Sequence, residues 1–200
     1  VFAQGSAGLT LDLAATNIEW ARGAGGNDSF DASNSAGDVT LDGRSGMDTL
    51  TGGVGGDTLR GGNDADVLTG NAGNDVLQGQ GGADQMFGGD GNDDLYVDAD
   101  DTAVDGGAGF DQVFAQGSAG LTLDLAATNI EWARGAGGND SFDATNSSGD
   151  VTLDGRGGMD TLTGGVGGDT LRGGNDADIL TGNAGNDVLQ GQGGADQLFG

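Results

Sequence analysis

A nine-residue unit recurs along most of the chain and limits its fold more than any other feature. The unit has glycine at positions 1 and 4, aspartate at position 6 and a bulky apolar residue at position 8. The clearest contiguous copies occupy residues 52–96 and read GGVGGDTLR, GGNDADVLT, GNAGNDVLQ, GQGGADQMF and GGDGNDDLY. Self-similarity at a short fixed period indicates a solenoid, in which each unit packs mainly against its neighbours.

The unit predicts short parallel strands separated by glycine-rich loops. Only position 8 is reliably apolar, as at Leu50, Leu59 and Leu77, so each strand presents one side chain to a thin core. Positions 7 and 9 then point outward. Helix is disfavoured because each glycine costs about 1 kcal/mol relative to alanine. We therefore expect an all-β solenoid in which six loop residues alternate with three strand residues.

A longer period encloses the short one. Residues 1–88 recur as residues 113–200, with five differences. One 112-residue copy divides into twelve units, so two units per coil would give six coils and an axial advance of about 29 Å. We expect a first repeat at 1–112 and a second, truncated repeat at 113–200, joined in one continuous solenoid. The chain starts and stops inside motifs and looks like a window cut from a longer protein.

Three stretches depart from the unit. Residues 113–134, with their counterpart from Val1, contain LTLDLAATNIEWAR, whose alternating apolar residues predict longer ordinary strands. Residues 31–42 predict a polar loop followed by a strand. We expect Trp20 and Trp132 to fill the core at these irregular coils rather than to stack on a ligand. In residues 97–105 the loop glycines are absent, which predicts a weak cation site or none.

Composition points to a cation-dependent fold. The 200 residues include 46 glycines and 32 acidic residues against 6 cationic ones, with no cysteine or histidine and a net charge of −26. Such a chain repels itself and stays disordered unless cations neutralise it. The same charge excludes nucleic acid and anionic lipid as partners. No apolar run approaches the roughly 18 residues needed for membrane insertion.

The loop GGxGxD, followed by a strand with one apolar residue, resembles the RTX (repeats-in-toxin) family of hemolysin-type calcium-binding repeats. The resemblance implies a right-handed parallel β-roll with two units per coil. It also implies that Ca²⁺ ions lie between stacked loops, bound by backbone carbonyls and position-6 aspartates. Carried over to this sequence, the implied metal ligands are Asp28, Asp48, Asp57, Asp66, Asp75, Asp84, Asp93 and Asp111, then Asp140, Asp160, Asp169, Asp178, Asp187 and Asp196.

Stacked partners should lie 18 residues apart, as Asp57 and Asp75 do. The pairs Asp28 with Asp48 and Asp140 with Asp160 are 20 apart and fit less well. We expect the six arginines to pair with surplus carboxylates at the surface rather than to bind a ligand.

These patterns predict a non-enzymatic protein. We expect a calcium-binding scaffold segment of a long secreted or cell-surface protein, such as an adhesin, a surface layer or a fibre. The resemblance implies type I secretion and folding on extracellular calcium. End-to-end or lateral self-assembly would follow from open solenoid ends. The alternative is a secretion and folding module of a toxin or hydrolase whose catalytic domain lies elsewhere. Ice binding is disfavoured because position 3 carries no threonine row.

Overall fold

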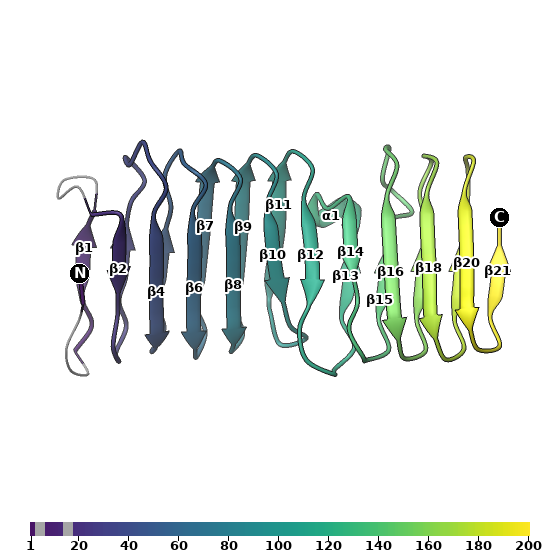
Figure 1. Cartoon of the computed structure of the whole chain (residues 1–200), viewed down its shortest axis with the longest axis horizontal. Helices are drawn as coiled ribbons and strands as arrows, with labels where there is room; N and C mark the ends of the chain where they lie inside the picture. Colours follow the sequence, from purple (N-terminus) through teal and green to yellow (C-terminus); the bar gives the residue numbers. More distant parts are fainter. Residues whose placement is uncertain (3–6, 14–17) are drawn as a thin grey trace. The chain divides into compact units, whose positions relative to one another are not determined.

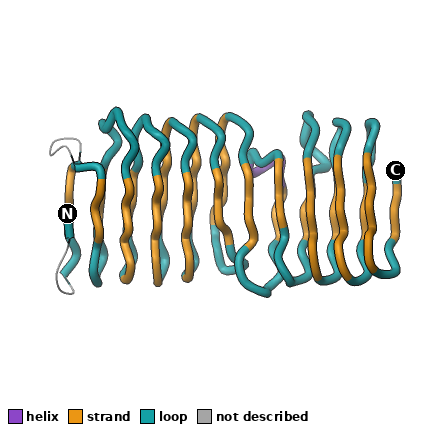
Figure 2. The backbone as a smooth tube through the Cα atoms, viewed as in Figure 1, coloured by secondary structure: helices purple, strands orange, loops and turns teal. Residues whose placement is uncertain are grey.

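The computed structural model describes residues 1–2, 7–13 and 18–200, and they form parallel β-solenoid coils (Figures 1 and 2). The chain divides into two compact units, Val1–Asp111 and Gln112–Gly200. Within each unit successive strands alternate between two parallel sheets, so two nonapeptides complete one coil. The predicted all-β solenoid with two units per coil is confirmed. Its continuity from one repeat to the next stays a prediction.

The first unit contains two facing sheets. One sheet has the order β1 (Thr10–Asp12), β3 (Ser29–Asp31), β5 (Thr49–Thr51), β7 (Val67–Ala72), β9 (Gln85–Asp90) and β11 (Ala103–Ala108). The other has the order β2 (Trp20–Arg22), β4 (Thr40–Ser45), β6 (Thr58–Asn63), β8 (Val76–Gly81) and β10 (Asp94–Val97). Strands pair in parallel with an offset of 18 residues wherever the nonapeptide is regular, as Leu59 does with Leu77.

The second unit repeats this arrangement. One sheet contains β12 (Gln112–Ala115), β14 (Trp132–Arg134), β16 (Thr152–Gly157), β18 (Thr170–Asn175) and β20 (Val188–Gly193). The other contains β13 (Thr122–Asp124), β15 (Ser141–Asp143), β17 (Thr161–Thr163), β19 (Ile179–Thr181) and β21 (Gln197–Phe199). Ser141 begins β15, twelve strands after β3, which begins at the equivalent Ser29. This offset matches the twelve units counted in the sequence.

Position 8 forms the core, as predicted. Leu50, Leu59, Leu68 and Leu77 have no exposed surface, whereas their neighbours at positions 7 and 9 are partly exposed. The strands, however, are often longer than three residues. β6 runs through positions 7 to 9 and on to position 3 of the next unit, because the ladder resumes after one unpaired glycine, with Gly62 opposite Gln80.

The irregular stretch at 113–134 does not form longer strands, and this expectation was wrong. It contains the short strands β13 and β14 and, between them, a single helical turn, α1 (Leu125–Thr128). Asp124 caps this turn, since its side chain accepts the N–H of Ala127, and Asn129 ends it in the left-handed region with φ 50°. Leu-Ala-Ala-Thr lacks glycine, which removes the penalty that disfavours helix elsewhere. The counterpart of α1 in the first copy falls partly outside the described residues.

The tryptophans also differ from expectation. In β2 and β14 the core position is taken by Ala21 and Ala133, which are fully buried. Trp20 and Trp132 precede these alanines, so they lie on the outer face of the sheet and are half-buried there. Alternation along a strand allows only one of two successive residues to face the core. Among the described residues, no helix is long and apolar enough to cross a membrane.

Candidate metal centres

The position-6 aspartates lie at the inner end of each loop, where the chain turns into a strand. Those in the covered coils are at most 2% exposed, including Asp48, Asp75, Asp93 and Asp160. Asp187 and Asp196 are only partly buried. The repeat therefore places a row of carboxylates inside the protein, beside a core of leucines.

One oxygen of each carboxylate builds a hydrogen-bond ladder. The backbone N–H of Asp57 donates to Asp75 Oδ1 at 2.7 Å, and the N–H of Asp75 donates to Asp93 Oδ1 at 2.8 Å. In the same way the backbone N–H of Asp160 donates to Asp178 Oδ1 at 2.9 Å, and the backbone N–H of Asp169 donates to Asp187 Oδ1 at 2.9 Å. A carboxylate that accepts amide donors is oriented by them, so its second oxygen has a fixed direction.

The same ladder joins every aspartate pair that the sequence predicted. The two pairs spaced by 20 residues are included. The backbone N–H of Asp28 donates to Asp48 Oδ1 at 2.6 Å, and that of Asp140 donates to Asp160 Oδ1 at 2.7 Å. The two additional residues are accommodated within the coil and do not interrupt the stack. The remaining predicted pairs are joined as Asp48 to Asp66, Asp66 to Asp84, Asp93 to Asp111 and Asp178 to Asp196.

The second oxygen of most ladder carboxylates is buried without a hydrogen-bond donor. This holds for Oδ2 of eight aspartates, namely Asp28, Asp48, Asp66, Asp75, Asp84, Asp93, Asp160 and Asp178. A buried charged oxygen without a partner is costly, so such a group takes up a proton or binds a cation. Repeated in register along the coils, this feature fits a row of cations.

The position-1 glycines show where such a cation would bind. A Cβ placed on Gly70 would meet both Asp75 Oδ2 and the carbonyl oxygen of Gly88 in the next coil. The same two kinds of oxygen surround Gly43, Gly88 and Gly155. Because two oxygens approach the point where a side chain would begin, glycine leaves a small oxygen-lined space. Carboxylate and carbonyl oxygens are the ligands that Ca²⁺ prefers.

Some aspartates are satisfied by their own loop. Asp57 Oδ2 accepts the N–H of Gly53 at 2.5 Å, and Asp169 Oδ2 accepts the N–H of Gly165 at 2.7 Å. In the preceding coil their ladder donors are Val39 and Val151 rather than aspartates. At these two positions a backbone amide therefore occupies the oxygen that most other coils leave available.

The degenerate unit at 97–105 is closed in a similar way. Asp101 takes the ladder position, since its Oδ1 accepts the N–H of Asp84 at 3.1 Å and its Oδ2 accepts that of Asp98 at 2.8 Å. Both oxygens are thus engaged by backbone donors. The structure gives a physical reason for the expected weak site, although its occupancy stays a prediction.

Burial changes the protonation of the ladder carboxylates. It raises the pKa of Asp66, Asp75 and Asp160 to about 7, with smaller contributions from neighbouring carboxylates and an opposing effect of the donated amides. The pKa of Asp48 is raised to about 6 for the same reasons. Without a cation, folding therefore favours protonated carboxyl groups at these positions.

A second ladder at position 5 was not predicted from the sequence. The side-chain Oδ1 of Asn74 accepts the N–H of Asn92 at 2.8 Å, and that of Asn92 accepts the N–H of Phe110 at 2.9 Å. Asn27 and Asn139 make equivalent bonds to Met47 and Met159. The recurring Asn-Asp dipeptide was the available signal. These bonds hold the outer rim of the loops in register.

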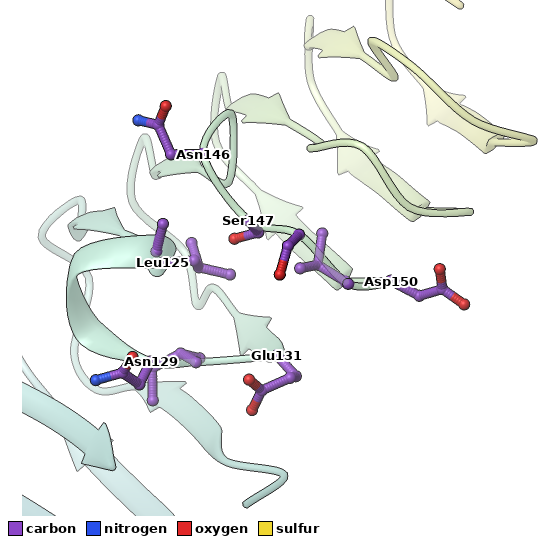
Figure 3. Close-up of a pocket in the computed structure, with 11 residues that line it drawn as sticks. Leu125, Asn129, Glu131, Asn146, Ser147 and Asp150 are labelled. Carbon is purple, nitrogen blue, oxygen red and sulfur yellow. The ribbon is translucent and has the colours of Figure 1, made fainter. Parts of the chain in front are cut away.

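A separate pocket of ≈180 Å³ lies in the second unit (Figure 3). It lies between the α1 region and the polar loop at residues 143–154, which is the counterpart of residues 31–42. Leu125 and Asn129 border it from the turn of α1, and Asn146 and Ser147 border it from the polar loop. At its margin Asp150 Oδ1 accepts the N–H of Gly168 at 2.7 Å. This carboxylate therefore anchors the loop to the next coil, outside the position-6 ladder.

In the position-6 ladders the carboxylates form stacked pairs rather than larger clusters. Within the described residues, no group of three or more aspartate or glutamate side chains is arranged to hold a metal. A cation at the ladder would consequently depend on backbone carbonyls as well as carboxylates. Repeated paired sites of this kind define a class of protein whose loops bind calcium along a β-roll.

Comparison with protein families agrees with this class. The model for the RTX calcium-binding nonapeptide repeat matches residues 22–59, 60–95, 80–113, 147–171 and 172–200. These segments cover most of the chain, so the protein belongs to the family of RTX calcium-binding repeat proteins. Comparison with curated proteins gives no match. The RTX β-roll is a structural calcium-binding fold.

Proposed function

We propose that this chain is a calcium-loaded structural segment of a long secreted or cell-surface protein. The observation that carries the proposal is the row of buried Oδ2 atoms without donors, which recurs beside carbonyl oxygens. At neutral pH these carboxylates need cations to be stable inside the fold. The ligands would be the position-6 aspartates, with Asp48, Asp66, Asp75 and Asp93 among the best supported.

Calcium would act as a folding switch. The net charge of −26 opposes compaction of the metal-free chain, and each bound ion removes part of that repulsion. Ligands that bind only the folded state stabilise it in proportion to their concentration. The chain would thus remain unfolded in low cytosolic calcium and fold after export into millimolar calcium. This behaviour supports an extracellular location.

Small-angle scattering and circular dichroism test the switch. The chain would be compared in chelator, in millimolar calcium and in millimolar magnesium. We expect an expanded coil in chelator and a compact β structure in calcium. Magnesium should substitute poorly, because it requires a tight octahedral shell that these loops are not built to supply. Equal compactness in all three solutions would refute calcium-driven folding.

The parent protein would serve as a scaffold rather than as an enzyme. The sequence repeats with a period of 112 residues, and one period holds an even number of units. Successive copies could therefore stack without changing the side on which calcium binds. We expect a rod or filament with an axial repeat of about 29 Å and a strand spacing of about 4.8 Å. Electron microscopy with layer-line analysis of the calcium-loaded parent would check this. A compact particle without these spacings would favour the secretion-module alternative.

A further inference from the structure

The cationic side chains of this acidic protein are concentrated on one sheet face in each copy. All six are arginines, and the chain has no lysine or histidine. They lie on β2, β4 and β6 in the first unit and on β14, β16 and β18 in the second. If the arginines served only to neutralise aspartates, they would be spread over all the coils. Their restriction to three successive strands of one sheet in each copy therefore needs another explanation.

In the first unit the arginines surround a polar hollow. Arg22 on β2, Asp42 on β4 and Arg60 on β6 are paired across three neighbouring strands. Arg44 lies two residues after Asp42 on β4. These four side chains contribute to a hollow of ≈370 Å³, together with Asn63 and Gln80. Its size lies within the range of about 300–1,000 Å³ typical of small-ligand sites.

The arginines exceed the acid available to them. Arg22 Nε lies 3.1 Å from Asp42 Oδ2, as the sequence led us to expect. Arg60 instead donates from Nε to Gln78 Oε1 at 3.1 Å, which leaves its charge unneutralised by that bond. Three arginines and a single carboxylate therefore line this hollow.

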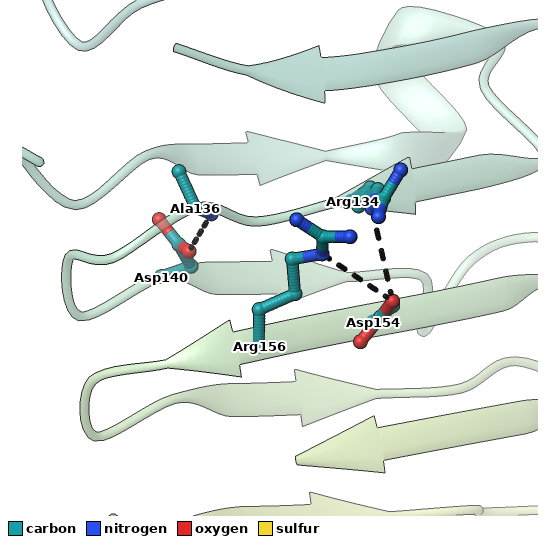
Figure 4. Close-up of polar contacts among 5 residues, drawn as sticks. All are labelled: Arg134, Ala136, Asp140, Asp154 and Arg156. Carbon is teal, nitrogen blue, oxygen red and sulfur yellow. Dashed lines mark hydrogen bonds and ion pairs between the residues drawn. The ribbon is translucent and has the colours of Figure 1, made fainter. Parts of the chain in front are cut away.

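The second unit repeats the arrangement (Figure 4). Asp154 Oδ2 lies 4.0 Å from Arg134 Nε and 3.9 Å from Arg156 Nε. Burial raises the pKa of Asp154, and the charges of Arg134 and Arg172 oppose that shift. All three arginines of this copy thus act on the same carboxylate.

An aromatic pair borders each group of arginines. Trp132 precedes Arg134 by two residues and shares its outer sheet face, and its ring lies 5.2 Å from that of Phe114. In the first unit Trp20 and Phe2 lie 4.7 Å apart beside Arg22. Each tryptophan is half-buried, whereas Phe2 is exposed. The tryptophan thus provides a flat apolar surface on the strand face that also carries the arginine two residues further on.

The backbone at Arg44 and Arg156 is unfavourable for a side chain. Their φ angles are 81° and 73°, in the left-handed region. Glycine occupies the equivalent position in some units, as at Gly62, but Asn71 and Gln80 adopt the same conformation in others. Glycine is free of this strain, so replacing these arginines by glycine is compatible with the backbone.

We propose that the arginine face of each copy binds a pyranose sugar that carries a carboxylate or sulfate group. Guanidinium groups match the paired oxygens of such groups, and the neighbouring tryptophan offers a surface for the apolar side of a sugar ring. The net charge of −26 repels extended polyanions, which favours a ligand with one isolated acidic group. The site is separate from the aspartate ladders and goes beyond the calcium-dependent scaffold.

Tryptophan fluorescence provides a direct test, because both tryptophans of the chain lie in these faces. Calcium-saturated protein would be titrated with glucuronate, neutral glucose and inorganic sulfate at constant ionic strength. Circular dichroism would first establish that the protein is folded, so failure of calcium-driven folding would be recognised separately. We expect saturable binding of glucuronate that is at least about tenfold tighter than that of glucose or sulfate.

Matched variants locate the site. Arg44→Gly with Arg156→Gly restores the residue that the backbone favours, so the fold is preserved while two guanidinium groups are lost. We expect glucuronate affinity to fall about tenfold. Asn71→Gly with Asn183→Gly makes the same kind of change at left-handed positions of β7 and of the loop after β19, and should leave affinity unchanged. Equal binding of glucose, sulfate as tight as glucuronate, or full affinity in the arginine variant would each overturn the proposal.

Discussion

Each ladder aspartate makes two different contributions through its two oxygens. In Asp75, Oδ1 accepts the N–H of Asp57, whereas Oδ2 is buried without a donor beside the carbonyl of Gly88. The first interaction needs only an acceptor, but the second needs a charge that a cation can neutralise. Substitutions can separate these two contributions.

Replacement of Asp75 should therefore depend on the residue introduced. Asp75→Asn keeps an acceptor for Asp57 but removes the charge from two predicted sites, so folding should require more calcium. Asp75→Ala also leaves the N–H of Asp57 without its acceptor, which costs about 1–3 kcal/mol more. Circular dichroism during calcium titration gives the folding midpoint. The exposed Asp90 supplies the control Asp90→Asn, and a midpoint identical to that control would contradict the ligand assignment.

The raised pKa values predict an unusual pH dependence for the calcium-free chain. Asp66, Asp75 and Asp160 have a pKa of about 7 in the fold, above the value near 4 of an unfolded aspartate. The folded state thus binds more protons, so it is favoured below about pH 4 and loses stability as pH rises through 7.

Circular dichroism of resin-stripped, calcium-free protein between pH 4 and pH 8 would check this dependence. We expect β structure to appear on acidification and to disappear toward neutral pH. A calcium-free fold that is more stable at pH 8 than at pH 5 would show that the carboxylates are not desolvated as described.

At the scale of the element, the loop depends on glycine at position 1. Gly70→Ala would place Cβ against Asp75 Oδ2 and the Gly88 carbonyl, in the space assigned to the cation. We expect a loss of about 1–3 kcal/mol in calcium, as for other overpacked sites. Gly37→Ala is the matched control, because nothing lies within 4 Å of its added Cβ. Urea unfolding in calcium would compare the two variants, and equal stabilities would refute the oxygen-lined space.

Much of the element was predictable because its determinants are local. The nine-residue period, the buried residue at position 8 and the aspartate at position 6 can all be read from the spacing of residues in the sequence. Leu77 and Asp75 are examples. The turn α1 was missed because the alternation of Leu121, Leu123 and Leu125 also suits a strand, and capping by Asp124 decided otherwise. The outward position of Trp132 depends on which neighbour enters the core, and this choice is made by strand pairing. The asparagine ladder requires contacts between coils.

At the scale of the whole molecule, charge and repetition act together. Thirty-two acidic residues oppose folding, yet the repeat places twelve of its aspartates in nearly complete burial. Such an arrangement is stable only with a matching number of protons or cations. The distribution of arginines, confined to six strands, indicates that they do not supply this neutralisation. We therefore propose that calcium supplies this neutralisation at neutral pH.

Anomalous scattering from crystals of the calcium-loaded protein would locate the bound ions. We expect discrete calcium peaks about 2.3–2.6 Å from Oδ2 of ladder aspartates such as Asp66, Asp75 and Asp93, repeated from coil to coil, which would establish calcium at the ladders. Peaks confined to exposed carboxylates such as Asp90, or an ordered roll without calcium at the ladders, would contradict this assignment.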